Sequence, residues 1–322
     1  MKAIRFHQTG GPEVLVVEDL ELPSPAAGQV RVRHTAIGVN FIDTYQRSGL
    51  YPVPLPSGLG MEAAGTVEAL GQGVGHLKIG DRVAYCSGPL GAYAQANNVT
   101  ADRIVALPGN ISDEDAAASL LKGLTAQYLL KRTYPVKRGQ TILFHSAAGG
   151  VGLIACQWAK HLGVTVIGSV GSDDKTALAE ANGCAHVVNT RNADWAKRTR
   201  EIAKDGVPVV YDSIGKDTFT GSLDCLAVRG MMVSFGNSSG AVPAFEPGLL
   251  SAKGSLYLTR PTLASYVRTP EELQETADDL FAVISSGAVK IAIHQRFALA
   301  DARKAHEALH SRATTGATIL IP

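Results

Sequence analysis

The stretch Ser146–Gly152, written SAAGGVG, places three glycines between an apolar run and an apolar, helix-like run. A tight turn from a strand into a helix lets backbone N–H groups and the positive helix end bind a pyrophosphate. In such a turn Gly149 allows close approach to the phosphates, and Gly152 allows the helix to pack on the strand. Ala147 stands where the dinucleotide fingerprint has its first glycine, and its methyl group is tolerated if φ stays negative. With a second apolar run ending near residue 170, the stretch predicts a dinucleotide site. The alternative is an ordinary strand-to-helix turn.

The residues at the end of that second apolar run indicate which of the two nicotinamide cofactors, NADH or NADPH, is preferred. An NAD-specific site presents Asp or Glu there to the ribose 2′-hydroxyl. Here the sequence is IGSVGSDDK, so Gly171 and Ser172 come first and Lys175 follows shortly after. A lysine offers charge-assisted hydrogen bonds to a 2′-phosphate, which favours NADPH. Asp173 and Asp174 count against a bound phosphate, unless they cap the helix that follows.

Composition narrows the class of protein. The chain has 322 residues, which favours two domains, and its 30 Lys and Arg balance its 29 Asp and Glu. This balance weighs against nucleic acid or an anionic membrane as the main partner. No apolar run reaches the roughly 18 residues that span a bilayer, and the N-terminus lacks the apolar core of a signal peptide. A cytoplasmic protein without a zinc lobe is expected, because no C-x-x-C spacing joins the cysteines Cys86, Cys156, Cys184 and Cys225.

Two kinds of hydrophobic pattern divide the chain. Residues 1 to about 110 hold short runs broken by Gly and Pro, which predicts strands of a small, partly open barrel, with one helix at 40–49. From about residue 123 apolar strands alternate with helices, as in a parallel, doubly wound sheet. After Pro261 the tail is expected to return to the first domain. The expected strands of the second part are 140–147, 164–170, 186–190, 207–215, 231–240 and 254–260, and the expected helices are 151–163, 174–183, 193–206, 217–230 and 269–287.

Longer motifs carry a resemblance that extends over essentially the whole chain. They are GPEVL, GVNFIDTYQRSGLYP, GMEAAGTV, GDRV, LLKGLTAQYLL, HSAAGGVGLIACQWAK, VYDSIG, VSFGNSSG and LYLTRP. Together they resemble the medium-chain dehydrogenase/reductase superfamily, and within it the quinone oxidoreductases of the zeta-crystallin type. The resemblance implies an α/β protein with a GroES-like β-barrel catalytic domain (1–122 with 262–322) and a doubly wound Rossmann domain (123–261). It also implies a cleft between the domains and a homodimer joined through the edge strand near 254–260.

The same resemblance implies the site residue by residue. Asn40, Tyr45 and Tyr51 fall where the family lines its substrate cleft and are expected to be catalytic. At the position of Thr190 the family often has a Tyr beside the adenine, and Arg191 is the alternative cover for that ring. The cofactor contacts carried over are Asn40, Thr125, Gly149, Gly150, Val151, Gly171, Ser172, Lys175, Thr190, Ser213, Phe235, Gly236, Asn237, Arg260 and Arg312.

Several of these candidates have a structural alternative. A tyrosine hydroxyl in the cleft would hydrogen-bond the reduced oxygen or pass it a proton. Alternatively, Tyr45 is a core aromatic residue that packs on Phe41, four positions earlier in the helix. Tyr51 is alternatively a loop anchor. Lys122 and Thr125 are expected at the start of a helix, and alternatively they have only a structural role there.

Zinc-dependent members of the superfamily hold their metal with a Cys, a His that precedes a Glu, and a second Cys. This chain has Asn40 at the first position and Met61 before Glu62. Glu62 alone does not supply the roughly four ligands that zinc takes, so no metal site is expected. The segment His306–His310, HEALH, matches a zinc-protease pattern, but the residues after it offer no third ligand. It is interpreted as a helix with two solvated histidines.

These expectations converge on a class of reaction. Without a Lewis acid to ionise an alcohol, alcohol oxidation loses its usual mechanism, whereas an electron-poor acceptor needs no such help. We expect NADPH-dependent hydride transfer from nicotinamide C4 to a quinone, with the protein orienting both rings and excluding water. A conjugated alkenal, enone or enoyl thioester is the alternative substrate. A non-enzymatic role, in RNA binding or as a structural protein, is a third class; the balanced charge and the cofactor loop weigh against it.

Overall fold

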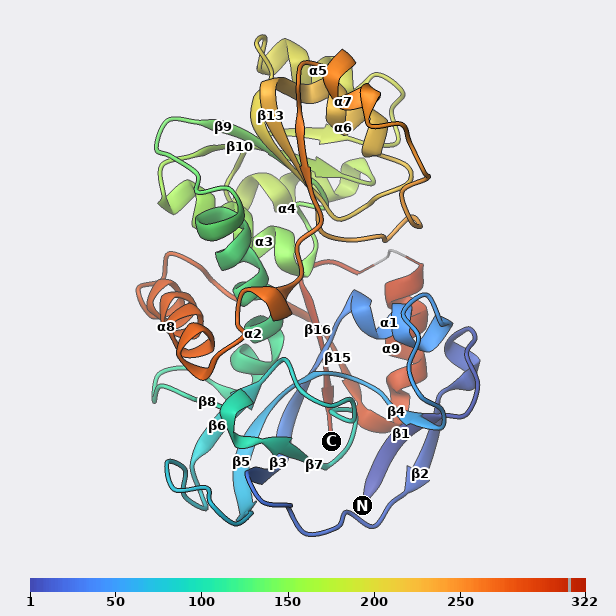
Figure 1. Ribbon diagram of the computed structural model, residues 1–322, viewed down its shortest axis with the longest axis vertical. Helices are drawn as coiled ribbons and strands as arrows, with labels where there is room; N and C mark the ends of the chain where they lie inside the picture. The colour runs from blue at the N-terminus through green and yellow to red at the C-terminus, as the bar shows by residue number, and fades with distance from the viewer. Residues whose placement is uncertain (312–313) are drawn as a thin grey trace. The chain divides into compact units, whose positions relative to one another are not determined.

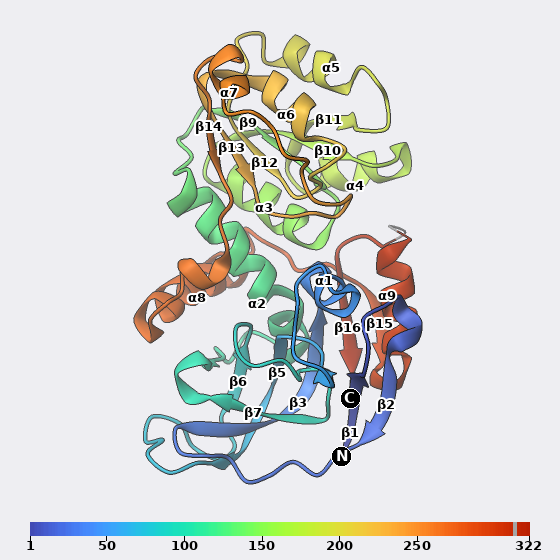
Figure 2. The ribbon, with the colours of Figure 1, turned by 45° about the vertical axis from the view of Figure 1, so that its right-hand side comes forward.

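The computed structural model describes residues 1–311 and 314–322 and divides into two compact units (Figures 1 and 2). Unit 1 comprises residues 1–124, 267–285 and 291–322, and unit 2 comprises residues 125–266 and 286–290. The boundaries expected from the sequence lie within a few residues of these, except that 286–290 groups with unit 2. Among the described helices, none combines the length and apolar character that a membrane span requires.

Unit 1 is built on a seven-stranded sheet and a three-stranded sheet. The first has the order β15-β16-β3-β5-β6-β8, with β7 also pairing with β3, and the second has the order β2-β1-β4. The strands are β1 (Lys2–Phe6), β2 (Val16–Asp19), β3 (Gln29–Val39), β4 (Ser57–Gly58), β5 (Glu62–Leu70), β6 (Arg82–Tyr85), β7 (Ala96–Thr100), β8 (Val105–Ala106), β15 (Ile293–Ala298) and β16 (Ala317–Ile321). The helices are α1 (Phe41–Ser48), most of α2 (Asp113–Tyr128), α8 (Pro270–Ser285) and α9 (Ala302–His310).

The long strand β3 organises the barrel because β5, β7 and β16 all pair with it, each antiparallel. Its side chains Val30 and Val32 alternate with outward residues and are buried in the core. At Gly65 of β5 the two strands approach so closely that a Cβ atom would lie 1.9 Å from the carbonyl oxygen of Arg33. Since β16 comes from the end of the chain, the tail returns to the first domain as expected.

Helix α1 presents the segment predicted to be catalytic. It follows β3 directly, and its N-cap residue Asn40 donates its backbone N–H to Oδ2 of Asp43 at 2.8 Å. Gly49, with a φ of 84°, ends the helix in the left-handed conformation that glycine adopts without strain. The helix predicted at 40–49 is thereby confirmed, and the end of a barrel strand fixes where it begins.

Unit 2 is a six-stranded parallel sheet in the order β11-β10-β9-β12-β13-β14. Helices α3 and α4 cover one face and α5 and α6 the other (Figures 1 and 2). The strands are β9 (Thr141–Phe144), β10 (Thr165–Val170), β11 (Cys184–Asn189), β12 (Val207–Asp212), β13 (Leu226–Ser234) and β14 (Tyr257–Thr259). The helices are α3 (Gly150–His161), α4 (Thr176–Ala181), α5 (Trp195–Ile202), α6 (Phe219–Cys225) and α7 (Gly248–Ala252).

The largest differences from the expected helix boundaries are at the end of α6 and the start of α2. The helix predicted at 217–230 ends at Cys225, because Leu226 already pairs with Val207 in the parallel ladder and begins β13. Helix α2 begins at Asp113, so Lys122 and Thr125 lie well inside it rather than at its opening. The expectation that these two residues serve a helix start is therefore wrong.

The chain order reverses next to β9. The path runs from β9 through β10 to β11 on one side, then crosses to β12, β13 and β14 on the other. In open parallel sheets, ligands bind beyond the carboxyl ends of the strands at such a reversal. The glycine-rich stretch that follows β9 lies at this point.

Candidate cofactor and active site

The tight point of the turn after β9 is Ser146, which is not one of the glycine positions of the dinucleotide fingerprint. Ser146 has a φ of 55°, so the left-handed position of the turn is held by a serine. Ala147 is fully buried, is not among the described residues of positive φ, and donates its N–H to the carbonyl oxygen of Ser169 at 2.8 Å. A Cβ atom on Gly152 would lie 2.2 Å from the carbonyl oxygen of Ser146. The condition set for Ala147 is met, and Gly152 is needed for helix-to-strand packing.

Loops from the neighbouring strands close around this turn. Ser213, after β12, donates its hydroxyl to the hydroxyl of Ser146 at 3.2 Å. Gly236, after β13, approaches Ser213 so closely that a Cβ atom would lie 2.5 Å from the Ser213 carbonyl oxygen. Seven predicted cofactor contacts therefore come from three adjacent strand ends: Gly149, Gly150, Val151, Ser213, Phe235, Gly236 and Asn237.

The loop after β10 carries the predicted phosphate-selecting residues. A Cβ atom on Gly171 would meet nothing within 4 Å, so the backbone is open there to a ligand. Burial, followed by the nearby positive charge of Arg191, lowers the pKa of Lys175, while the carboxylate of Asp174 opposes this. Thr190, after β11, donates its backbone N–H to the carbonyl oxygen of Val170 at 2.9 Å. The structure thus brings two cations together at the end of β10.

The sequence favours helix capping by Asp173 and Asp174, and the structure gives these two residues other roles. Oδ1 of Asp173 accepts a hydrogen bond from the side chain of Asn189 at 2.8 Å. A hydrogen bond from Ser172 lowers the pKa of Asp174. Within the described residues, neither the turn 173–175 nor α4 has a side-chain cap hydrogen bond. Asp173 is therefore tied to a neighbouring strand end, and the capping interpretation is wrong.

Two further predicted contacts lie elsewhere in unit 2, and a third lies outside the described residues. Arg260 follows β14, and its charge acts on Tyr128 of α2, where burial raises the pKa of the phenol. Thr125 is buried in the same helix. Arg312 lies outside the described residues.

In unit 1 the predicted catalytic residue Asn40 belongs to a buried charged group. Its Nδ2 donates to Oε2 of Glu62 at 2.8 Å, and Lys122 donates to the same oxygen at 3.1 Å. The other oxygen of Glu62 accepts the backbone N–H of Leu121 at 2.6 Å. A Cβ atom on Gly38 would lie 2.1 Å from Glu62 Oε2, so this glycine admits the carboxylate. Because a carboxylate only accepts, Asn40 is held with its NH₂ group toward Glu62.

A second buried chain joins α1 to α9. Tyr93 donates its hydroxyl to Oδ2 of Asp43 at 2.9 Å, and its oxygen lies 3.1 Å from Nε2 of His306. Nδ1 of His306 accepts from Arg47 at 3.1 Å. His306 is fully buried, and only His310 is exposed, so the interpretation of HEALH as a helix with two solvated histidines is wrong for His306. Both ring nitrogens of His306 are already engaged.

Burial raises the pKa of Asp43 to about 7. Because this value exceeds the unfolded pKa, the group stabilises the fold at low pH, and that contribution is lost as the pH rises towards 7. Between pH 5 and pH 7 we expect the free energy of unfolding to fall by about 2–3 kcal/mol through this one carboxyl. Asp43→Asn keeps an oxygen for Tyr93 and cannot ionise, so it should remove that fall.

Urea unfolding at pH 5 and pH 8 measures this difference, with the exposed Asp205→Asn as the matched control. The stability of Asp43→Asn relative to wild type should rise between the two pH values, and that of Asp205→Asn should not. Parallel pH profiles for wild type and Asp43→Asn would show that Asp43 does not titrate in this range.

The remaining catalytic candidates form an aromatic cluster on and after α1. The rings of Tyr45 and Tyr51 meet edge to face with centroids 5.3 Å apart, and Phe41 lies 6.4 Å from Tyr45. Both tyrosines are partly exposed, so neither is a core residue, and Phe41 is 37% exposed. The backbone N–H of Tyr51 also binds the carbonyl oxygen of Tyr45 at 3.0 Å. The structure therefore brings Tyr45 and Tyr51 together at a surface of unit 1.

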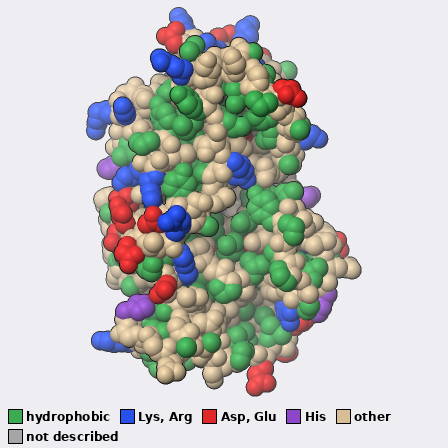
Figure 3. Space-filling model, in the orientation of Figure 1, with side chains coloured by type: hydrophobic (Ala, Val, Ile, Leu, Met, Phe, Trp, Pro, Cys, Tyr) green, Lys and Arg blue, Asp and Glu red, His purple; other side chains and the backbone are tan. Residues whose placement is uncertain are grey.

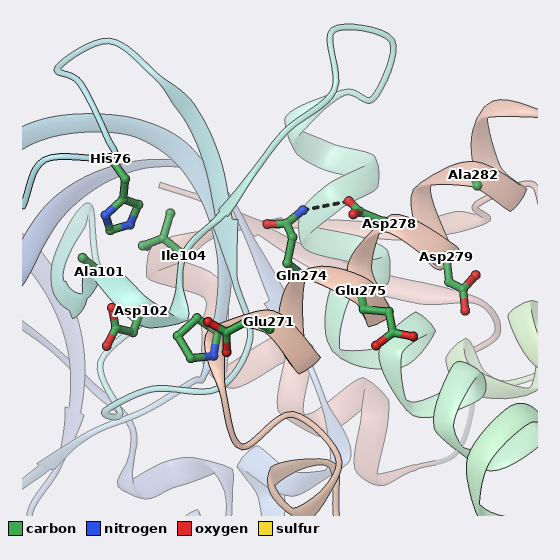
Figure 4. Close-up of a pocket in the computed structure, with 11 residues that line it drawn as sticks. His76, Ala101, Asp102, Ile104, Glu271, Gln274, Glu275, Asp278, Asp279 and Ala282 are labelled. Carbon is green, nitrogen blue, oxygen red and sulfur yellow. Dashed lines mark hydrogen bonds between the residues drawn. The ribbon is translucent and has the colours of Figure 1, made fainter.

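A separate groove of about 990 Å³ in unit 1 is lined by acidic side chains of α8 (Figure 4). Asp102 and Glu271 face it, and Gln274 donates to Asp278 at 2.7 Å along the helix. Asp and Glu side chains gather over α8 on the molecular surface (Figure 3). None of the residues predicted for the site lines this groove. Its negative charge opposes the binding of a phosphate, so it is not the cofactor site.

Metal ligands were not expected, and the residues at the family's ligand positions have other partners. Met61 accepts a hydrogen bond from Gln46 at 3.6 Å from its sulfur, and Asn40 is bound to Glu62. In the described parts of the chain, no three His, Cys, Asp or Glu side chains are grouped so that they could hold a metal ion.

Known proteins place these features in a family. A family model described as "Alcohol dehydrogenase GroES-like domain" matches residues 26–132, and one described as "Zinc-binding dehydrogenase" matches residues 150–282. The chain is 56% identical to a quinone oxidoreductase of Pseudomonas aeruginosa over 100% of this chain and 99% of the relative. It is 44% identical to a 2-haloacrylate reductase of Burkholderia sp., over 98% of each chain.

Solved structures agree with the sequence relatives. The crystal structure of Escherichia coli quinone oxidoreductase complexed with NADPH matches with a TM-score of 0.99 and 54% identity, and the match covers 100% of both chains. The two matched domain types, the parallel sheet and the sequence identity over the full length of the chain all indicate the same family. The chain belongs to the quinone oxidoreductase family of the medium-chain dehydrogenase/reductase superfamily.

Proposed function

We propose that this protein is an NADPH-dependent quinone reductase. The observation that carries the proposal is the convergence of the predicted cofactor contacts at the carboxyl ends of β9, β10, β12 and β13, with the cations Lys175 and Arg191 at one side. The relatives named as quinone oxidoreductases, and the NADPH complex of one of them, support it. NADPH, when bound, supplies a hydride from nicotinamide C4.

The residues of unit 2 fit this cofactor. Ser146 turns the chain into α3, whose N-terminal N–H groups and helix dipole would bind the pyrophosphate of NADPH. The open backbone at Gly171 leaves space for a ribose, and Lys175 with Arg191 supplies the charge for a 2′-phosphate. We propose that Thr190 and Arg191 flank the adenine, and that Arg260, Thr125 and Arg312 complete the contacts.

We propose further that the reaction proceeds without zinc. The buried ion pair of Glu62 and Lys122 is internally neutral, and Glu62 is already occupied by Asn40, Lys122 and a backbone N–H. This arrangement gives Glu62 no need of a metal to balance its charge. A quinone is already electron-poor, so its reduction needs no Lewis acid. Asn40, fixed by Glu62, is then a residue that positions the nicotinamide.

Tyr51 is our preferred donor of a hydrogen bond to the reduced oxygen, with Tyr45 holding its ring edge to face. Tyr51→Phe should lower kcat for quinone reduction by about 10-fold, because one charge-assisted hydrogen bond to a developing oxyanion is lost. The KM for NADPH should not change. Initial rates over a range of benzoquinone concentrations, and over a range of NADPH concentrations at saturating benzoquinone, measure both quantities. Tyr45→Phe is the matched control, and an unchanged kcat for Tyr51→Phe would remove Tyr51 from the mechanism.

A second candidate function rests on the 44% identical relative named as a 2-haloacrylate reductase. In that case the hydride would reach the carbon of a conjugated alkene. Purified protein should be assayed for NADPH oxidation with a quinone, an enone, an alkenal, a haloacrylate and an enoyl thioester. Quinone turnover at least about 10-fold more efficient than any other supports the proposal. Preference for an alkene would replace it with the second candidate.

We also propose a homodimer joined through β14. This strand is at the edge of the six-stranded sheet, so on one side it has no neighbour among the described strands. Tyr257 is 59% exposed on it, and the adjacent Val228 is 73% exposed. Pairing of β14 with a second copy would satisfy the edge and cover these side chains.

A further inference from the structure

A fully buried chain of polar side chains crosses unit 2 beneath the predicted cofactor loops. His145 immediately precedes Ser146, and its Nδ1 lies 2.7 Å from the hydroxyl of Ser169 on β10. Its Nε2 lies 2.9 Å from the hydroxyl of Ser222 on α6. Ser222 donates to Oδ2 of Asp212, the last residue of β12, at 2.8 Å. All four side chains are fully buried.

The direction of every hydrogen bond in this chain follows from Asp212. The Asp212 carboxylate only accepts, so the Ser222 proton points to Asp212, and the Ser222 oxygen accepts Nε2–H of His145. Burial lowers the pKa of His145, which keeps the imidazole neutral despite the Asp212 carboxylate 3.9 Å away. Nδ1 is then an acceptor, and Ser169 donates to it. The order Ser169 to His145 to Ser222 to Asp212 is therefore unique.

This chain ties together the three strand ends that carry the cofactor loops. His145 leads into the turn at 146–151, Ser169 into the loop at 171–175, and Asp212 into the loop at 213–215. Asp212 also holds its own loop, because Oδ1 accepts the N–H groups of Ile214 and Gly215 at 2.7 and 3.0 Å. The links run across β10, β9 and β12, which are neighbours in the sheet at the point of reversal.

We propose that the Ser169–His145–Ser222–Asp212 chain is a positioning network that sets the affinity for NADPH. This inference rests on the proposed function and extends it to residues that do not touch the cofactor. One ligand must contact three loops at once, so fixing their spacing before binding lowers the entropy lost on binding. Backbone bonds such as His145 N–H to the Tyr211 carbonyl oxygen, at 2.9 Å, hold the strands, and the side chains fix the loops beyond them.

Two substitutions of His145 divide the network into halves. Asparagine places its amide near the position of Nδ1 and keeps only the Ser169 link, whereas glutamine reaches the position of Nε2 and keeps only the Ser222 link. Each variant should raise the Kd for NADPH by about 10-fold, since one buried polar group loses its partner. The value of kcat at saturating NADPH, and the KM for benzoquinone, should stay within about twofold of wild type. Ser222→Ala is the milder second variant and should raise Kd in the same direction.

Trp195, which contacts the ring of His145, provides a structural control. Trp195 packs edge to face on the His145 ring with centroids 5.3 Å apart, outside the hydrogen-bond chain. Trp195→Phe should lower the melting temperature of the cofactor-free protein and leave the Kd for NADPH unchanged. Isothermal titration calorimetry with NADPH and thermal unfolding without it give the two readouts.

The outcomes separate this inference from the function on which it rests. A Kd raised in the His145 and Ser222 variants and unchanged in Trp195→Phe supports the network. NADPH binding by wild type with Kd unchanged in all His145 and Ser222 variants overturns the network alone, as does a Kd that rises in Trp195→Phe by the same factor. Absence of NADPH binding by wild type overturns the proposed function, and with it this inference.

Discussion

Gly152→Ala is expected to raise the Kd for NADPH by about 100-fold, equivalent to about 3 kcal/mol. The added Cβ atom would lie 2.2 Å from the carbonyl oxygen of Ser146 and 2.7 Å from Cα of Ala147. Both are backbone atoms of the turn, so the first turn of α3 must move away from β9. Alanine favours a helix over glycine by roughly 1 kcal/mol, so helix propensity alone predicts a more stable α3 and no weakening of NADPH binding. A loss of binding therefore reports the close approach itself.

The matched control for this substitution is Gly248→Ala. Gly248 begins α7 in the same unit, and a Cβ atom there would meet nothing within 4 Å. Equilibrium binding of NADPH and the melting temperature should both be as in wild type for this control. If Gly152→Ala binds NADPH as tightly as Gly248→Ala does, α3 does not contact the cofactor through this turn.

Lys175→Ala is expected to reduce the preference for NADPH over NADH, measured as the ratio of kcat/KM, by about 10- to 100-fold. A hydrogen bond to a charged group contributes about 1.5–3 kcal/mol, and NADH has no phosphate to receive it. Burial is the main cause that lowers the pKa of Lys175, the carboxylate of Asp174 opposes it, and Arg191 adds to the lowering, so Arg191 is a second cation close enough to bind the same 2′-phosphate. Lys175→Ala with Arg191→Ala should therefore abolish the preference.

Efficiency with NADH is the internal control for Lys175→Ala and should change little. Lys204→Ala, which removes an exposed lysine elsewhere in unit 2, controls for the loss of one charge. A fall of equal size with both cofactors would mean that Lys175 supports the loop rather than the 2′-phosphate. An unchanged ratio would remove it from phosphate recognition.

Much of the fold could be predicted from the spacing of apolar residues and from the Gly and Pro residues that interrupt it. Apolar strands that alternate with helices specified the parallel sheet, and the glycine at 49 marked the end of α1. The boundary between α6 and β13 was missed because the run from Cys225 to Val228 is apolar and fits either a helix or a strand. The pairing of Leu226 with Val207 of β12 determines where the helix ends and the strand begins. A contact with a residue distant in the sequence leaves no local signal.

The site was predicted where backbone shape determines the residue, and missed where a buried side chain does. Gly149 and Gly152 are visible because a phosphate turn needs them. His145 and Asp212 sit inside apolar runs, and a polar residue there gives no sign of its partners. Those of His145 lie 24 and 77 positions away along the chain, and Ser222 lies 10 positions from Asp212. For His306 a signal existed, because it shares a helix face with Ala302, Ala305 and Leu309, which are all buried.

The central claim is hydride transfer from NADPH to a quinone without zinc, and one steady-state measurement tests it most directly. NADPH oxidation with 1,4-benzoquinone is followed before and after exhaustive treatment with a zinc chelator, and repeated with NADH. The account predicts an unchanged rate after chelation and an efficiency with NADPH at least about 10-fold above that with NADH. Loss of the activity on chelation with recovery on added zinc, or no benzoquinone-dependent oxidation of NADPH, would contradict it.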